Sequence, residues 1–78
     1  MHYPQYRKYS NGKSYFCIHS PQEFEEIQQL GSRWTCYHFT ARILPDRNLI
    51  HDMTFDYKGH WEECSLDEFE GIRLLVKK

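Results

Sequence analysis

The residues best suited to chemistry in this sequence are cysteines and histidines at short, recurring spacings. Two Cys-x-His pairs and one His-x-x-x-Cys pair occur: Cys17 and His19, Cys36 and His38, His60 and Cys64. Thiolate and imidazole are ligands that zinc prefers, so each pair is a candidate part of a metal site. Residues two apart in a strand lie roughly 6.5–7 Å from each other, however, and zinc-binding pairs usually lie on Cys-x-x-Cys turns. The spacing argues against a metal ion, and we expect neither a metal nor a small-molecule cofactor.

The same residues raise the question of nucleophilic catalysis, in which a histidine deprotonates a cysteine. The combinations to weigh are Cys36 with His19 and Cys64 with His60. Such a pair needs a thiolate of low pKa and a third group that orients the histidine within a cleft. Nothing in the sequence indicates a cleft, and the four glycines form no phosphate-binding loop. We therefore expect a protein that is not an enzyme.

The elements that position these residues must fit into a short chain. Its 78 residues suit one domain, predicted over residues 1–78. The chain holds one valine and one alanine against six Tyr, five Phe and two Trp. Aromatic side chains bury large areas, so a few rings can fill a small core. The remaining rings are expected at the surface, where they are candidates for binding.

Cysteine content and hydropathy indicate the compartment. Three cysteines are an odd and sparse set, whereas a small secreted domain usually carries an even, dense disulfide framework. No apolar run approaches the roughly 20 residues of a membrane span, and no signal-peptide pattern opens the chain. We expect a cytoplasmic protein with reduced thiols and no membrane association.

Turn and cap signals divide the first half of the chain. Asn11-Gly12 is a preferred hairpin turn, because both positions favour positive φ, and it joins predicted strands over 3–9 and 13–19. Ser20-x-x-Glu23 is a helix capping box, with Pro at the first helical position. Apolar residues then recur every three positions up to Leu30, before a glycine, which predicts a helix.

The second half indicates three strands and another helix. The strands are predicted over 33–44, 49–56 and 60–64, with turns between them. A second capping box, Ser65-x-x-Glu68, opens the helix. The resulting ββαβββα order predicts an α+β domain, in which two helices cover one face of a small, mostly antiparallel sheet of four to five strands.

The hairpin turn also predicts which side chains share a face. Counting outward from Asn11-Gly12 pairs Lys8 with Tyr15 and Tyr6 with Cys17. If both helices cover the opposite, Phe-rich face, this face stays open as a binding surface. Its predicted binding residues, with those added by the next strand, are Tyr6, Lys8, Tyr15, His19, Trp34, His38 and Arg42.

Charge and aromatic content indicate the kind of partner. Residues 1–22 contain three basic residues and no acid, whereas all eleven acids lie from Glu23 onward. Exposed Tyr, Trp and Arg are typical of protein interfaces, so we expect a binding module whose aromatic sheet face contacts a protein partner or a second copy of itself. The alternative is single-stranded RNA or DNA, held by the basic, Tyr-rich hairpin and the sheet face. Few basic groups and the acidic helices count against this alternative.

Overall fold

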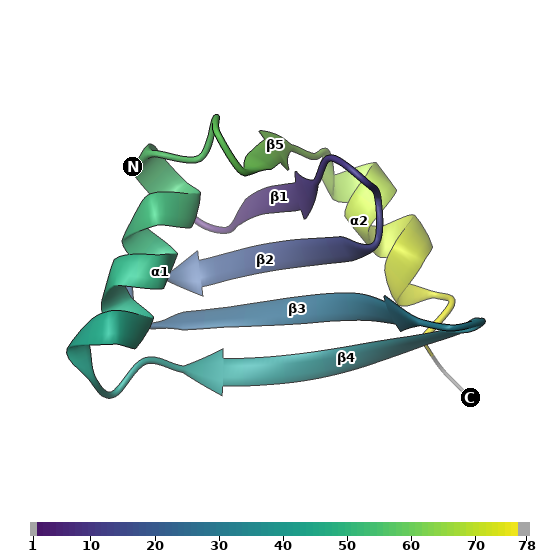
Figure 1. Cartoon of the computed structure of the whole chain (residues 1–78), viewed down its shortest axis with the longest axis horizontal. Coiled ribbons are helices and arrows are strands. Elements are labelled where there is room, and N and C mark those ends of the chain that lie inside the picture. The colour runs from purple at the N-terminus through teal and green to yellow at the C-terminus, as the bar shows by residue number, and fades with distance from the viewer. Residues whose placement is uncertain (1, 77–78) are drawn as a thin grey trace.

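Four consecutive antiparallel strands form most of the sheet in the structure, a computed structural model that describes residues 2–76. The strands are β1 Gln5–Tyr9, β2 Ser14–Ser20, β3 Glu23–Leu30, β4 Arg33–Thr40 and β5 Trp61–Glu63, and the helices are α1 Leu44–Phe55 and α2 Leu66–Arg73. The strand order is β4-β3-β2-β1-β5, so β4 and β5 form the two edges of the sheet (Figure 1). The predicted α+β class, an antiparallel sheet with two helices, is confirmed. Within residues 2–76, no helix is long and apolar enough to cross a membrane.

The first hairpin forms as the sequence predicts. Its register pairs Tyr6 with Cys17 and Lys8 with Tyr15. Gly12 has a φ of 73°, a left-handed conformation that glycine adopts without a steric penalty. Because the register is the one counted from the turn, the faces assigned to the side chains of β1 and β2 are also correct.

Strand β3 occupies the segment for which the sequence predicted the first helix. Phe24 pairs with Ile18 and Ile27 pairs with Tyr15, so these two apolar residues of β3 lie on opposite faces of the sheet. Both are buried, because the sheet is covered on each face. Gly31, with a φ of 66°, makes the turn into β4 and does not end a helix.

Helix α1 occupies the segment for which the sequence predicted a strand over 49–56. Its buried residues are Ile50, Met53 and Thr54, which follow helical spacing. Pro45 lies in the first turn of α1, where its missing N–H leaves no helical hydrogen bond unmade. The observed element order is therefore ββββαβα, which differs from the predicted ββαβββα by the exchange of one helix and one strand.

Helix α2 begins at the predicted capping box. The Ser65 hydroxyl oxygen accepts a hydrogen bond from the N–H of Glu68 at 3.0 Å. Phe69 is fully buried beneath the helix. The short predicted strand before it is also present, as β5, which pairs with β1.

The two helices lie on opposite faces of the sheet, whereas the sequence analysis expected both on one face. The cluster beneath α1 contains Phe16, Ile18, Phe24, Ala41, Ile50, Met53 and Trp61. The cluster beneath α2 contains Tyr15, Cys17, Ile27 and Phe69. Neighbouring residues of β2 alternate between these clusters, as strand geometry requires. Figure 1 shows the helices at opposite ends of the strands, so each covers only part of its face.

Candidate functional site

The face predicted to be open is the face that α2 covers. Tyr15 is buried, and its ring centroid lies 6.0 Å from that of Trp34. The Tyr6 ring lies 5.3 Å from Phe69 of α2. The sequence correctly placed these rings on one face, but their predicted exposure is not found, because they form much of the core beneath α2.

The basic side chains of the first hairpin are engaged within the fold. Lys8 Nζ lies 2.7 Å from a carboxylate oxygen of Glu68, and this hydrogen bond raises the pKa of Lys8. Arg7 is buried and donates to backbone carbonyls at the end of α1. Arg42 lies exposed between β4 and α1. The structure therefore leaves the hairpin with less free positive charge than its composition indicates.

Strand β4 presents an unpaired backbone edge. The N–H of Ala41 donates to the carbonyl of Gln22 at 2.6 Å, which continues the pairing of β4 with β3. Hydrogen bonding alternates along an antiparallel strand, so the odd-numbered residues of β4 bond to β3. The outward residues are Trp34, Cys36, His38 and Thr40. Among residues 2–76, no strand pairs with this outer side.

Apolar side chains lie beside this edge. Tyr37 and Phe39 are 39% and 40% exposed and point to the face of α1, where Phe39 stacks on Phe24. Ile43 and Leu44, which join β4 to α1, are also exposed. We call the outer edge of β4, with Tyr37, Phe39, Ile43 and Leu44, the β4 surface. Both rings lie on the Phe-rich side of the sheet, which was expected to be buried under the helices, but neither ring is buried.

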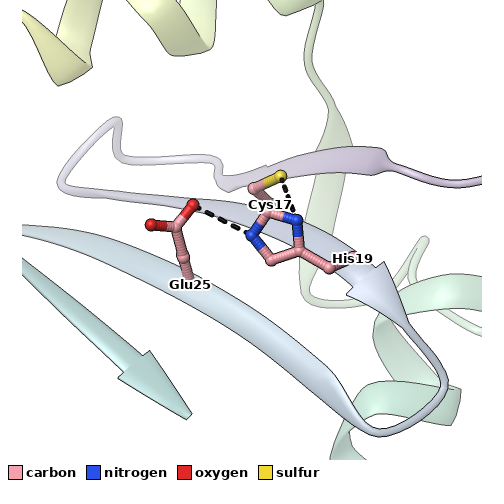
Figure 2. Close-up of side chains that lie close together, drawn as sticks. All are labelled: Cys17, His19 and Glu25. Atoms are coloured by element: carbon pink, nitrogen blue, oxygen red, sulfur yellow. Dashed lines mark hydrogen bonds and ion pairs between the residues drawn. The ribbon is translucent and has the colours of Figure 1, made fainter. Parts of the chain in front are cut away.

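Three polar side chains gather on the opposite face, near the end of β2. Figure 2 shows Cys17 and His19 of β2 beside Glu25 of β3. Cys17 Sγ lies 3.8 Å from His19 Nδ1, and His19 Nε2 lies 3.0 Å from Glu25 Oε1. The β2–β3 register shifts between Ile18 and Ser20, so the ring of His19 is placed by a bulge. We call Cys17, His19 and Glu25 the thiol cluster.

In the thiol cluster a cysteine, a histidine and a carboxylate contact one another in the order found in a nucleophilic triad. The pKa of the cysteine, however, is raised and not lowered. Burial, with a contribution from the charge of Glu25, raises the pKa of Cys17 to about 11. Arg73 of α2 donates to Glu25 Oε1 at 3.0 Å and lowers the pKa of that carboxyl. A protonated thiol whose residue is only 2% exposed is a poor nucleophile.

The remaining sequence candidates lie outside the thiol cluster. His38 pairs with Glu25 across β3 and β4, and its ring centroid lies 6.1 Å from that of His19, but its Nε2 contacts a carboxylate oxygen of Glu23 at 3.0 Å. The ring of His60 packs against Trp61, and the Cys64 thiol donates to the carbonyl of Ser65. His60 and Cys64 are not among the donors that the described residues bring within metal-ligand distance.

Comparison with known proteins adds no relative. The chain matches no protein-family model, and neither the curated proteins nor the solved structures give a significant match. Function is therefore inferred from the geometry of the β4 surface and of the thiol cluster.

Proposed function

We propose that this protein is a small, non-enzymatic binding module that pairs with a second copy of itself along β4. The observation that carries the proposal is the unpaired edge of this strand, which is eight residues long and borders exposed rings. Unpaired N–H and C=O groups along such an edge are a template for another strand. Exposed aromatic side chains beside them supply the apolar contact that an interface needs.

The two edges of the sheet differ in how they are protected. Natural proteins blunt free edges with short strands, charged residues, proline or bulges. Edge β5 has three residues, two of them glutamates. Edge β4 has no proline or lysine, and Arg33 at its start is its one formally charged residue. Only β5 carries the usual protection, which supports β4 as the binding edge.

A second copy of the chain fits this edge. Antiparallel pairing about a two-fold axis at Tyr37 places Cys36 opposite His38 of the second copy. The outward N–H and C=O groups of one β4 strand can then form hydrogen bonds with those of the other. The two Tyr37 rings then meet on the apolar face, each flanked by Phe39. Arg33 of each copy lies at an opposite end of the pair, so no like charges face one another. The same edge thus complements itself.

The nucleic-acid alternative has less support. Lys8 is paired with Glu68 and Arg7 is buried, which removes two of the three basic groups of the hairpin from a phosphate backbone. The absence of a reactive thiolate in the thiol cluster supports a non-enzymatic role. We expect the module in the cytoplasm, where its three free cysteines stay reduced.

Sedimentation equilibrium of the untagged, reduced protein tests the proposal. The average mass should rise with concentration toward twice the monomer mass. Tyr37→Lys should weaken association by at least about tenfold, since lysine on an edge strand opposes pairing. The variant should still fold, because residue 37 faces Glu26 across β3 and β4.

Phe55→Lys is the matched control. Phe55 is another exposed aromatic residue, at the end of α1 and outside the β4 surface, so this variant should associate like the wild type. A protein that stays monomeric at all concentrations, or equal effects of the two substitutions, would refute pairing along β4. Salt-sensitive binding of a mixed oligonucleotide by such a monomer would favour the alternative.

A further inference from the structure

Sulfur, nitrogen and oxygen donors from three adjacent strands meet on the face beneath α2. Cys17 of β2 pairs directly with Glu25 of β3, and the neighbouring residue pair joins Ile27 to Cys36 of β4. Cys36 Sγ lies 3.8 Å from Glu25 Oε2, so Glu25 lies between Cys17 and a second cysteine. The three donor residues of the thiol cluster lie on the face of α2, and Arg73 of this helix contacts Glu25.

The distances within the thiol cluster are close to those of a metal site. One donor atom from each of Cys17, His19 and Glu25 lies within 4.8 Å of the other two. A tetrahedral zinc ion holds its donors roughly 3.3–3.8 Å apart, because Zn–N and Zn–S bonds are about 2.0 and 2.3 Å long. The distances between the three donor atoms therefore need to shorten by on the order of 1 Å for the atoms to bind one ion.

The bulge in β2 removes the objection that the sequence raises against a metal. In a regular strand, residues 17 and 19 would hold their side chains too far apart to share one ion. The register shift after Ile18 leaves His19 without a direct partner on β3, and its ring turns toward Cys17. The second Cys-x-His pair has no such shift, and His38 contacts Glu23 instead.

We infer that Cys17, His19 and Glu25 bind one tetrahedral transition-metal ion with a fourth position left for water, and zinc is the ion that suits one sulfur, one nitrogen and one oxygen best. The site lies on the face opposite the rings of the β4 surface and is independent of the proposed self-pairing. It would hold α2 to the sheet through Arg73, whose guanidinium already contacts Glu25.

Charge balance favours a divalent ion here. One thiolate and one carboxylate carry two negative charges, which a divalent ion balances, while Arg73 also forms an ion pair with Glu70 at 3.3 Å. A buried site with no net charge avoids most of the desolvation cost of an unpaired charge. An ion on Glu25 would replace its contact with His19, while the contact of Arg73 with Oε2 can remain.

An ion can reach the site from solvent. His19 is exposed, and Cys36 lines an open groove together with Trp34 and Leu74. The groove separates β4 from the chain that follows α2. The donors are thus accessible without unfolding of the sheet.

Titration of the tag-free, metal-stripped, reduced protein with Co²⁺ tests the inference. One equivalent should produce the visible bands of tetrahedral cobalt and a near-ultraviolet thiolate charge-transfer band, and Zn²⁺ should displace both. His19→Gln should lower the affinity by more than about tenfold. Cys17→Ser should remove the charge-transfer band, because the one sulfur ligand is lost, whereas Cys36→Ser should leave the band in place.

His51→Gln is the matched control, because His51 is an exposed histidine on α1, which packs on the other face of the sheet. Its affinity should equal that of the wild type. Both histidines are exposed at the surface, so neither variant depends on repacking of the core, and circular dichroism confirms the fold of each. Absence of saturable Co²⁺ binding, no effect of His19→Gln, or an equal loss in His51→Gln would each overturn the site.

Discussion

Replacement of Arg7 by methionine is expected to lower the free energy of unfolding by about 3–5 kcal/mol. Arg7 is 4% exposed, and its Nε and one terminal nitrogen donate to the carbonyls of Met53 and Thr54 at 2.8 and 3.2 Å. The last carbonyls of a helix have no helical N–H partner. Helix α1 carries no basic residue in its last turn, so Arg7 of β1 supplies both the donors and the positive charge. Methionine fills the space but leaves these carbonyls buried and unpaired.

Two variants separate this role from general effects of charge and size. Arg7→Lys keeps the charge but loses the planar set of donors and the stacking on the Tyr57 ring, 4.0 Å away, so an intermediate loss is expected. Arg42→Met replaces an exposed arginine by the same residue as in Arg7→Met. It should change the free energy of unfolding by less than about 0.5 kcal/mol. Urea denaturation followed by circular dichroism measures all three. Similar losses for Arg7→Met and Arg42→Met would show that Arg7 does not hold α1.

Phe69→Ala is expected to cost about 3–5 kcal/mol and to release α2 from the sheet. Phe69 is fully buried and is the buried residue of this eight-residue helix. A helix this short is unstable in water without packing, so the loss of its anchor removes the main reason for it to form. Arg73 leaves with the helix, so its contact with Glu25 is also lost.

Phe55→Ala provides the comparison for this substitution. It removes the same atoms from a ring that is 56% exposed on α1, so the expected loss is below about 1 kcal/mol. Thermal unfolding of both variants gives the difference in their stability. Trp34 fluorescence reports whether the face beneath α2 becomes exposed to solvent. Equal stability of the two variants would exclude Phe69 as the anchor of α2.

Local signals predicted the parts of the fold that local chemistry decides. The Asn11-Gly12 turn sets the register of β1 and β2, because one turn geometry fixes all later pairs. The hydroxyl of Ser65 satisfies an N–H of α2 that would otherwise lack a partner. Neither feature depends on residues far away in the sequence, so both could be predicted.

Segments whose burial depends on distant elements were misassigned. Phe24 and Ile27 have helical spacing, yet in β3 they enter two different cores, which happens only when both faces of a sheet are covered. Residues 49–56 were predicted to be a strand because apolar and polar residues alternate there. The same segment also contains Ile50, Met53 and Thr54 at helical spacing, and these are the buried residues of α1. Periodicity cannot separate a strand buried on both faces from a helix segment.

In the candidate sites, too, the sequence predicted what local structure decides and not what depends on distant elements. The sequence placed Tyr6, Tyr15 and Trp34 on one face correctly, but the position of α2 decides that this face is buried. Tyr37 lies on the side expected to be buried under the helices, but its ring is not buried. The contact between Cys17 and His19 depends on a bulge that no turn or spacing signal marks.

Amide hydrogen exchange along β4, measured over a range of protein concentrations, tests the central claim of self-pairing most directly. The N–H groups of Cys36 and His38 point outward, so they should exchange rapidly in dilute protein and gain protection as the concentration rises. The N–H of Ala41, bonded to Gln22, should be protected to the same degree throughout. Rapid exchange of Cys36 and His38 at every concentration, with the β3-bonded amides still protected, would contradict pairing along β4.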